Sequence, residues 1–480
     1  QPMAQAQQPP VTPTPQPMAQ PQQPPVTPTP QQAPQPQQPP VTPTLQPSGY
    51  TPYATATGYE ARVDGAGAIR ARRKRRIAPV IAVVVFVVVG FAATLMWLNR
   101  PVTITVNGAP TEVRVGSTLK EVLQGQDLVV NPGNYVTVAG DVIRANEGYA
   151  FSASVNGEDV NPDIIGEYQV KGGEAIELGD GADKVEEHTA TVETIKPYLR
   201  MEGSGYELQY ISQWAEEGVL EHRVGKESGQ KADVVTKEKK DCVVTCRDLT
   251  IEGDEKYVAL TFDDGPADPY TEQYLEILDR YGVKATFYNL GSNIESYPEL
   301  AKRIVDSGHQ LANHTMDHNQ LTADAGEEVL EQIQISADVI QRNTGVTTTH
   351  IRPPYGDFTE RSWLATQGSI TAAIRWSGDS RDWELGGSAA IVENALLDIH
   401  SGSIILMHDG GGDRSQDVEA LPVIIERLQA DGYTFVTVSD LMRAAGDIPE
   451  DICSGTGTLP EGCVWPDEID PEDLTAAGTT

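Results

Sequence analysis

The pattern of apolar and polar residues changes along the chain, and its C-terminal half alternates between strand-like and helix-like segments. Short apolar stretches at residues 257–262 and 284–291 have the length and composition of buried strands. Each is followed by a segment with helical periodicity, at residues 268–282 and 297–308, and glycine ends both segments. The alternation repeats, which implies parallel strands joined by crossover helices. With about seven strand signals of this kind, we predict an α/β domain at residues 253–445, folded as a distorted (β/α) barrel.

Residues 101–180 show the shorter alternation of a sheet with one buried face. Residues 102–108 and 111–116 alternate apolar and polar positions around a glycine-containing turn, and residues 118–124 have the pattern of a short helix. Together with the short strands that follow, this pattern predicts a smaller β-rich, β-grasp-like module, which we interpret as a spacer or binding domain. Residues 181–252 are rich in Glu, Lys and Thr, and they fit either an edge-strand extension of the next domain or a linker.

One apolar run is long enough to cross a bilayer. Residues 77–98 hold no charge over 22 positions, and roughly 20 apolar residues span the hydrocarbon core. A basic run at residues 70–76 precedes them, so the positive-inside rule places residues 1–76 in the cytoplasm and the rest outside. A cleaved signal peptide fits less well, because the apolar run is longer than a typical h-region and about 70 residues precede it. We therefore predict an uncleaved signal anchor, with the later domains at the cell surface.

The first 76 residues have a composition that disfavours a folded core. Near-repeats rich in Pro and Gln occupy residues 1–45 and favour disordered, solvated polyproline II. Such a tail is either a flexible cytoplasmic segment or a docking site for a partner that reads proline motifs. The first 76 residues carry an excess of Lys and Arg, so the acidic residues behind the chain's net charge of −34 lie in the remainder, including an acidic C-terminal tail at residues 446–480. A body this acidic disfavours nucleic acid as a partner.

All four cysteines follow the apolar run, at Cys242, Cys246, Cys453 and Cys463. An even number in an oxidising compartment predicts two disulfides, and three pairings are open. A zinc site is the alternative, but neither local pair has the usual two-residue spacing and no His lies close by. We therefore predict structural disulfides.

Polar residues gather where the predicted parallel strands end. The carboxyl ends of such strands meet at one face of the fold, which is where barrels of this kind build active sites. The clusters, in chain order, are TFDDGP (261–266), NHTMDH (313–318), RPPYG (352–356), DSRDW (379–383) and LMHDG (406–410).

The first two clusters hold the residue types of a catalytic metal site. His314 and His318 are four positions apart, so on a helical turn both imidazoles can face one point. Two His residues and one carboxylate make a three-ligand site that leaves a position open for water. Of the adjacent Asp263 and Asp264, one can bind the metal while the other takes a proton from metal-bound water.

The later clusters supply the remaining chemistry. Arg352 can hold the second carboxylate charged and oriented, and His408 can protonate a leaving group from the opposite side. The whole set suits hydrolysis of an amide or an ester. Each piece alone also has a structural explanation, since adjacent aspartates before Gly-Pro often only shape a turn and a single His can be a satisfied core residue. The catalytic interpretation is favoured because all five clusters occur in order at the ends of successive predicted strands.

These five motifs together resemble the NodB-homology polysaccharide deacetylases, carbohydrate esterase family 4, over about residues 253–443. The resemblance implies one divalent metal, usually zinc and sometimes cobalt or another ion, bound by Asp264, His314 and His318. It implies that Asp263 is the general base, paired with Arg352, and that His408 is the general acid.

The same resemblance implies the surroundings of the reacting atoms. The backbone N–H of Tyr355 would help to form the oxyanion hole. Trp383 and Leu406 would form the pocket wall. The DSRDW segment would supply an acid that orients His408, and Asp382 is favoured over Asp379 for this role.

The predicted function is therefore metal-dependent removal of N-acetyl groups from an extracellular amino-sugar polymer. A location at a bacterial cell surface favours the N-acetylglucosamine or N-acetylmuramic acid of peptidoglycan as substrate. Chitin-type oligomers, exopolysaccharide and acetylated xylan are alternatives. An alternative of another class is a membrane-anchored scaffold that binds the cell wall without turnover.

Overall fold

The computed structural model describes residues 89, 96, 100–126, 128–322 and 326–476. The predicted disordered tail at residues 1–76, with its proline-motif partner, lies outside the described residues, as does the predicted span at residues 77–98 apart from Val89 and Met96. Across the described ranges, no helix is long and apolar enough to cross a bilayer. The span and the topology that follows from it stay predictions.

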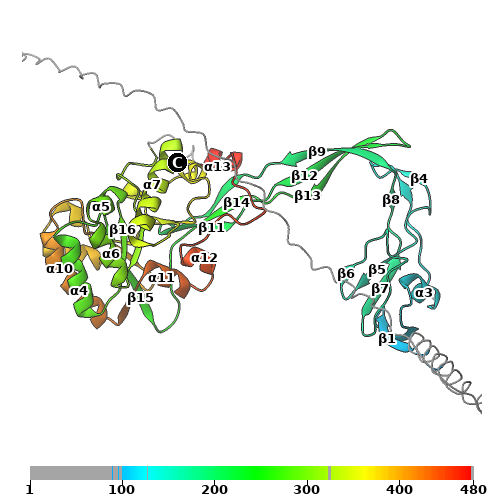
Figure 1. Ribbon diagram of the computed structural model, residues 1–480, viewed down its shortest axis with the longest axis horizontal. Helices are drawn as coiled ribbons and strands as arrows, with labels where there is room; N and C mark the ends of the chain where they lie inside the picture. The colour runs from blue at the N-terminus through cyan, green and yellow to red at the C-terminus, as the bar shows by residue number, and fades with distance from the viewer. Residues whose placement is uncertain (1–88, 90–95, 97–99, 127, 323–325, 477–480) are drawn as a thin grey trace, which may run out of the picture. The chain divides into compact units, whose positions relative to one another are not determined.

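The strands after residue 255 belong to an eleven-stranded sheet that curls into a half barrel (Figure 1). Its order is β10-β14-β11-β19-β18-β17-β16-β15-β21-β20, and β22 pairs with β15. Every pair among strands β15 to β22 is parallel. The parallel strands are β15 (Lys256–Asp263), β16 (Thr286–Asn289), β17 (Gln310–Asn313), β18 (His350–Ile351), β19 (Ala372–Ile374), β20 (Gly378–Asp379), β21 (Ile404–His408) and β22 (Tyr433–Val436). The α/β class is confirmed, and within the described ranges the strands follow an open path rather than a closed ring.

Helices cover the half barrel and fix its strand ends. Helix α4 ends at Gly282, whose φ of 64° is left-handed, and α6 has Pro298 in its first turn. The ring of Phe262 on β15 packs edge-on against Tyr274 of α4, with 4.8 Å between the ring centroids. This contact holds the carboxyl end of β15 in the core. The helices of this domain are α4 (Tyr270–Tyr281), α5 (Gly291–Ser296), α6 (Pro298–Asp306), α7 (Gly326–Thr344), α8 (Glu360–Ala365), α9 (Ser388–Ala395), α10 (Ser415–Ala430) and α11 (Val438–Ala444), with short 3-10 turns η1 (Pro354–Gly356) and η2 (Asp382–Glu384).

The segment at residues 181–252, which the sequence left open, contributes strands to three sheets, and its first strand, β8 (Lys184–Val185), pairs with a strand of the preceding module. Strands β10 (Leu199–Gly203), β11 (Leu208–Gln213) and β14 (Cys242–Arg247) extend the large sheet, because β11 pairs antiparallel with β19. The other strands, β9 (His188–Ile195), β12 (Gly218–Gly225) and β13 (Lys231–Lys237), form a separate antiparallel sheet. An edge-strand extension is therefore present, although it does not account for the whole segment.

The described part of the predicted acidic C-terminal tail packs against this extension. Bridges join Leu199 to Ile469 and Ala215 to Val464, and the indole of Trp465 donates to the Leu364 carbonyl at 2.9 Å. The segment also holds the short helices α12 (Glu450–Cys453) and α13 (Pro471–Ala476).

Residues 101–180 contain a small sheet with one helix across it. Its order is β2-β1-β7-β5-β6, and the neighbouring strands β1 and β7 run parallel. Helix α3 (Leu119–Gln124) starts with a capping box between Thr118 and Glu121 and buries Leu119 against the sheet. The strands are β1 (Pro101–Val106), β2 (Ala109–Arg114), β5 (Phe151–Val155), β6 (Glu158–Asp159) and β7 (Ala175–Asp180), and a second small sheet holds β3 (Tyr135–Val136), β4 (Val142–Arg144) and β8 (Lys184–Val185).

The predicted disulfides are not supported, because all four cysteines are free thiols. Cys242 and Cys246 lie at opposite ends of β14, about 13 Å apart at the usual rise along a strand, which is too far for a disulfide. Cys242 and Cys453 are buried in two different hydrophobic clusters. The buried thiols therefore act as small apolar side chains in the core.

Candidate active site

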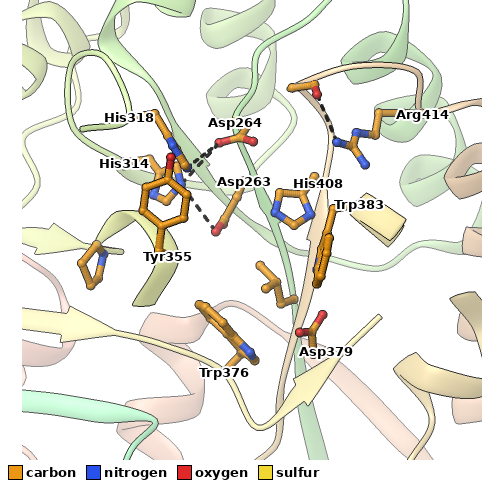
Figure 2. Close-up of a pocket in the computed structure, with 13 residues that line it drawn as sticks. Asp263, Asp264, His314, His318, Tyr355, Trp376, Asp379, Trp383, His408 and Arg414 are labelled. Atoms are coloured by element: carbon orange, nitrogen blue, oxygen red, sulfur yellow. Dashed lines mark hydrogen bonds and ion pairs between the residues drawn. The ribbon is translucent and has the colours of Figure 1, made fainter. Parts of the chain in front are cut away.

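The carboxyl ends of the parallel strands bring the predicted site residues together (Figure 2). Asp263 is the last residue of β15, and the register of the neighbouring strand places it opposite His408, the last residue of β21. His314 directly follows β17, and Arg352 directly follows β18. The alternation of strands and helices thus predicts correctly which face of the sheet carries the site.

Asp264, His314 and His318 form the one group of potential metal ligands in the described ranges. Their ligand atoms all lie within 4.8 Å of one another. Each histidine Nε2 lies 3.4 Å from Asp264 Oδ1, and that buried oxygen has no hydrogen-bond donor within the described residues. His314 Nδ1 donates to the Arg352 carbonyl at 2.7 Å, which leaves Nε2 as the ligating nitrogen. An oxygen without a donor beside two imidazole nitrogens is the donor set that a divalent cation such as zinc requires.

The two histidines converge by a route different from the predicted helical turn. Residues 314–318 form an irregular loop in which Thr315 and His318 have φ angles of 72° and 62°. The loop is held by Asn313, whose side-chain oxygen accepts from the Thr315 N–H at 2.7 Å. The imidazole centroids still lie 5.1 Å apart. Asp264 itself has a φ of 67°, so left-handed backbone recurs where the ligands meet.

Charge inside this group is strongly coupled. Burial opposes ionisation of Asp264, but the positive charges of His314, His408 and His318 hold the pKa of this carboxyl well below its usual range. Burial and the charge of His314 lower the pKa of His318. The neutral imidazole that a metal needs is therefore favoured at His318, beside a carboxylate that stays ionised.

Asp263 lies beside the ligand group in a separate ion pair. Arg352, which is fully buried, donates to its Oδ1 at 2.9 Å and to Thr261 Oγ1 at 2.7 Å. The other guanidinium nitrogens donate to the carbonyls of Ile374 and Arg375 at 3.3 and 3.0 Å. The second carboxylate oxygen of Asp263 lies 3.7 Å from His314 Nε2, on the side of the metal ligands. One oxygen is thus anchored, and the other faces the reacting atoms.

Asp382, and not Asp379, holds His408. Its Oδ1 accepts from His408 Nδ1 and its Oδ2 from the His408 backbone N–H, each at 2.7 Å. Asp379 instead accepts from the Arg381 N–H at 2.8 Å. Although burial acts against the charge, the hydrogen bond to Asp382 and the nearby carboxylates raise the pKa of His408 to about 9. The ring therefore carries a proton at neutral pH, with Nε2 free to offer it.

A pocket of about 510 Å³ is lined by Asp263, Asp264, His314, His318 and His408. Figure 2 shows the side chains around it. Tyr355 and Trp383 stand at its mouth with exposed side chains, and Leu406 lies buried in its wall. Tyr355 has a φ of 61° and its ring lies 4.7 Å from that of His318. The sequence reasoning missed Trp376, Pro353, Gly411 and Arg414, which also line the pocket.

The one feature of the sequence that could have indicated these pocket residues is their position within or just after a strand or motif. Trp376 comes two residues after β19, and Arg414 comes six residues after His408. Their side chains belong to loops, whose paths no periodicity predicts.

Comparisons with known proteins agree with this geometry. The sequence profile of the family described as polysaccharide deacetylase matches residues 250–369. The peptidoglycan-N-acetylglucosamine deacetylase of Bacillus cereus is 37% identical over 195 residues, which cover 40% of this chain and 91% of that protein. The peptidoglycan-N-acetylmuramic acid deacetylase PdaC of Bacillus subtilis is 35% identical, with 43% of each chain covered.

Among solved structures, that of the peptidoglycan deacetylase PdaC from Bacillus subtilis is 33% identical, covers 41% of this chain and 94% of that chain, and has a TM-score of 0.38. The family profile falls on the half barrel that carries the site, and the match to the Bacillus cereus enzyme covers nearly all of that protein. The chain belongs to the polysaccharide deacetylase family.

Proposed function

We propose that this enzyme removes N-acetyl groups from the amino sugars of peptidoglycan, with N-acetylglucosamine and N-acetylmuramic acid as the two candidate sugars. The observation that carries the proposal is the placement of Asp263 and His408 as neighbours across β15 and β21, beside the ligand group Asp264, His314 and His318. A base and an acid then flank the position where a substrate carbonyl would meet a metal. The names of the relatives described above support peptidoglycan over other acetylated polymers.

Asp264, His314 and His318 would hold one divalent ion, and we take zinc as the first candidate because the set has one oxygen and two nitrogen donors. When bound, such an ion polarises the acetyl carbonyl and makes water a stronger nucleophile at neutral pH.

Asp263 acts as the general base in this proposal. Its free oxygen takes a proton from the attacking water, while Arg352 binds the other oxygen and keeps the carboxylate correctly oriented. The water oxygen forms a bond to the acetyl carbon, and the carbonyl oxygen gains negative charge. The backbone N–H of Tyr355 is proposed to donate to that oxygen.

His408 completes the reaction as general acid. Its protonated Nε2 gives a proton to the amide nitrogen as the carbon–nitrogen bond breaks, so the products are acetate and a free amino sugar. Asp382 holds the ring through Nδ1 and stabilises its charge. Trp383 and Leu406 form the wall against which the sugar lies.

The proposed location is the outer face of a bacterial membrane, with residues 1–76 in the cytoplasm. The apolar run at residues 77–98 and the basic residues before it support this topology. A single helix would then tether the catalytic domain next to the cell wall. A cytoplasmic partner for the proline-rich tail is a further part of the proposal.

The test is acetate release by the full-length chain from purified peptidoglycan and from N-acetylglucosamine oligomers. Release that a chelator abolishes and added zinc restores would support the proposal, and the ratio between the two substrates would rank peptidoglycan against chitin-type oligomers. If the zinc-loaded chain releases no acetate from either substrate or from acetylated xylan, the proposal fails and binding without turnover becomes the better description.

A further inference from the structure

Asp417 is a buried carboxyl group that the proposed mechanism does not use. It lies in the first turn of α10 with no exposed surface, and neither of its oxygens has a hydrogen-bond donor within the described residues. No ion pair within 4.0 Å involves it in those residues. A buried carboxylate without a partner is strongly unfavourable, so the group takes up a proton.

Charged and titratable side chains lie on the elements that pack around Asp417. Arg414 donates from Nε to the Gly410 carbonyl at 2.7 Å and from Nη2 to the Gly411 carbonyl at 3.3 Å, and its Nη1 lies 3.9 Å from Asp382 Oδ1. Tyr274 on α4 donates its hydroxyl to the His408 carbonyl at 2.9 Å. On the side of α9, Glu393 is exposed to solvent.

Asp382 is the acceptor for that proton, because a side-chain hydrogen bond joins its carboxylate to the Asp417 carboxyl. Asp382 already accepts from the ring and the backbone of His408 and keeps a lone pair for a third donor. The other carboxyl of this region, Asp409, accepts from Thr271 Oγ1 at 2.5 Å.

We propose that Asp417 is a positioning residue for the deacetylation: as a neutral acid it donates a hydrogen bond to Asp382 and so fixes the carboxylate that orients His408. The three side chains then form a chain, Asp417–Asp382–His408, in which the two acids share one proton and carry one negative charge. Burial and the negative charge of Asp382 raise the pKa of Asp417, in agreement with a protonated group at neutral pH. This inference rests on the proposed role of His408 as general acid.

The proposal distinguishes two substitutions of similar size. Asp417→Asn keeps a donor toward Asp382, because the side-chain amide can replace the carboxyl proton. Asp417→Leu removes the donor and keeps the volume. We expect kcat on N-acetylglucosamine oligomers to stay within about twofold of wild type in the Asn variant and to fall about tenfold in the Leu variant, with KM unchanged in both. Glu419→Gln, an exposed acid on the same helix, is the matched control and should have no effect.

A titration gives a second readout that does not depend on turnover or on the Leu variant folding. As the pH rises, ionisation of Asp417 adds a second negative charge, which holds the proton on His408 more strongly. The Asn variant cannot gain this charge, so its His408 imidazole should lose its proton at a pH that is lower than in wild type by roughly half a unit. NMR follows the titration of the imidazole signal, which is assigned by its absence in His408→Ala.

The two measurements separate the inference from the proposed function. A wild-type chain without deacetylase activity would overturn the proposed function, while the NMR titration would still decide the role of Asp417. Equal His408 titrations in wild type and Asp417→Asn, or equal loss of kcat in the Asn and Leu variants, would overturn the role of Asp417.

Discussion

The guanidinium of Arg352 and the carboxylate of Asp263 form an ion pair of 2.9 Å in which Arg352 is fully buried and Asp263 is only 3% exposed. The charge on Arg352 is further compensated by two backbone carbonyls and by the ring of Tyr288, which lies 4.2 Å from its centre. Breaking a buried pair of this kind leaves an isolated charge in the interior. The proposed base is therefore also part of the folded core.

We expect Arg352→Leu to destabilise the fold and to abolish acetate release. Removal of one member of a buried ion pair costs about 3–5 kcal/mol of unfolding free energy, and Asp263 would lose the partner that orients it as a base. Chemical denaturation and an acetate assay measure the two effects. Arg361→Leu, which removes an exposed arginine of α8, should change the unfolding free energy by less than about 0.5 kcal/mol. A stable and active Arg352→Leu variant would contradict this role.

The activity should fall at alkaline pH as His408 loses its proton. The folded-state pKa of this histidine is raised to about 9, mainly by the hydrogen bond to Asp382 against the effect of burial. A divalent cation at Asp264 would offset part of the negative charge, so we expect the midpoint in the metal-loaded enzyme to lie somewhat below that value. The pH dependence of kcat measures it. His408→Ala should lower kcat by about 10²-fold, whereas His222→Ala, on the separate sheet of β12, should not.

The same raised pKa predicts how the His408–Asp382 pair contributes to stability. A group whose pKa is higher in the folded state stabilises the fold fully below its unfolded pKa, about 6.5 for histidine, and loses the contribution as the pH rises through the folded value of about 9. We therefore expect the unfolding free energy to decline over this interval in wild type. His408→Ala should remove that part of the decline, and parallel curves for the two proteins would contradict the assignment.

The sequence predicts the parallel part of the fold well because its signals are local. Residues 257–262 alone indicate β15, and the glycine after α4 marks the end of that helix through a left-handed cap. The order of the five motifs then fixes which side chains meet, since parallel strands end on one face. Asp263 and His408 follow from this rule without any structure.

Other features were beyond the sequence because they depend on loops and on burial. The loop between His314 and His318 uses left-handed backbone where a helical turn was expected. The sequence gives no signal for the role of Asp417, because Arg414 provides no side-chain cap at the N-terminus of α10 and the residues of the first turn have the pattern of a polar loop. Whether an aspartate is exposed or buried against another acid is decided by packing.

Metal binding should stabilise the folded chain through Asp264. A ligand that binds only the folded state adds about 2.7 kcal/mol when its free concentration is about 100 times Kd, so a chelator should lower Tm and added zinc should restore it. Asp264→Ala should abolish the response to zinc. The control is Asp317→Asn, an exposed carboxylate between the two histidines, which should respond like wild type. A zinc-dependent Tm shift that persists in Asp264→Ala would show that the ion binds elsewhere.

Trp383 should determine how well long substrates bind. Its side chain is 56% exposed and lines the pocket mouth, where an indole can stack on a sugar ring. We expect Trp383→Ala to raise KM for N-acetylglucosamine oligomers about three- to tenfold with a smaller effect on kcat, because stacking contributes equally to the ground and transition states. Leu385 is the matched control, since it is 52% exposed two residues away and is not part of the pocket lining. A larger rise in KM for Trp383→Ala than for Leu385→Ala would support a stacking surface. A loss of kcat with KM unchanged would instead place Trp383 in the catalytic step itself.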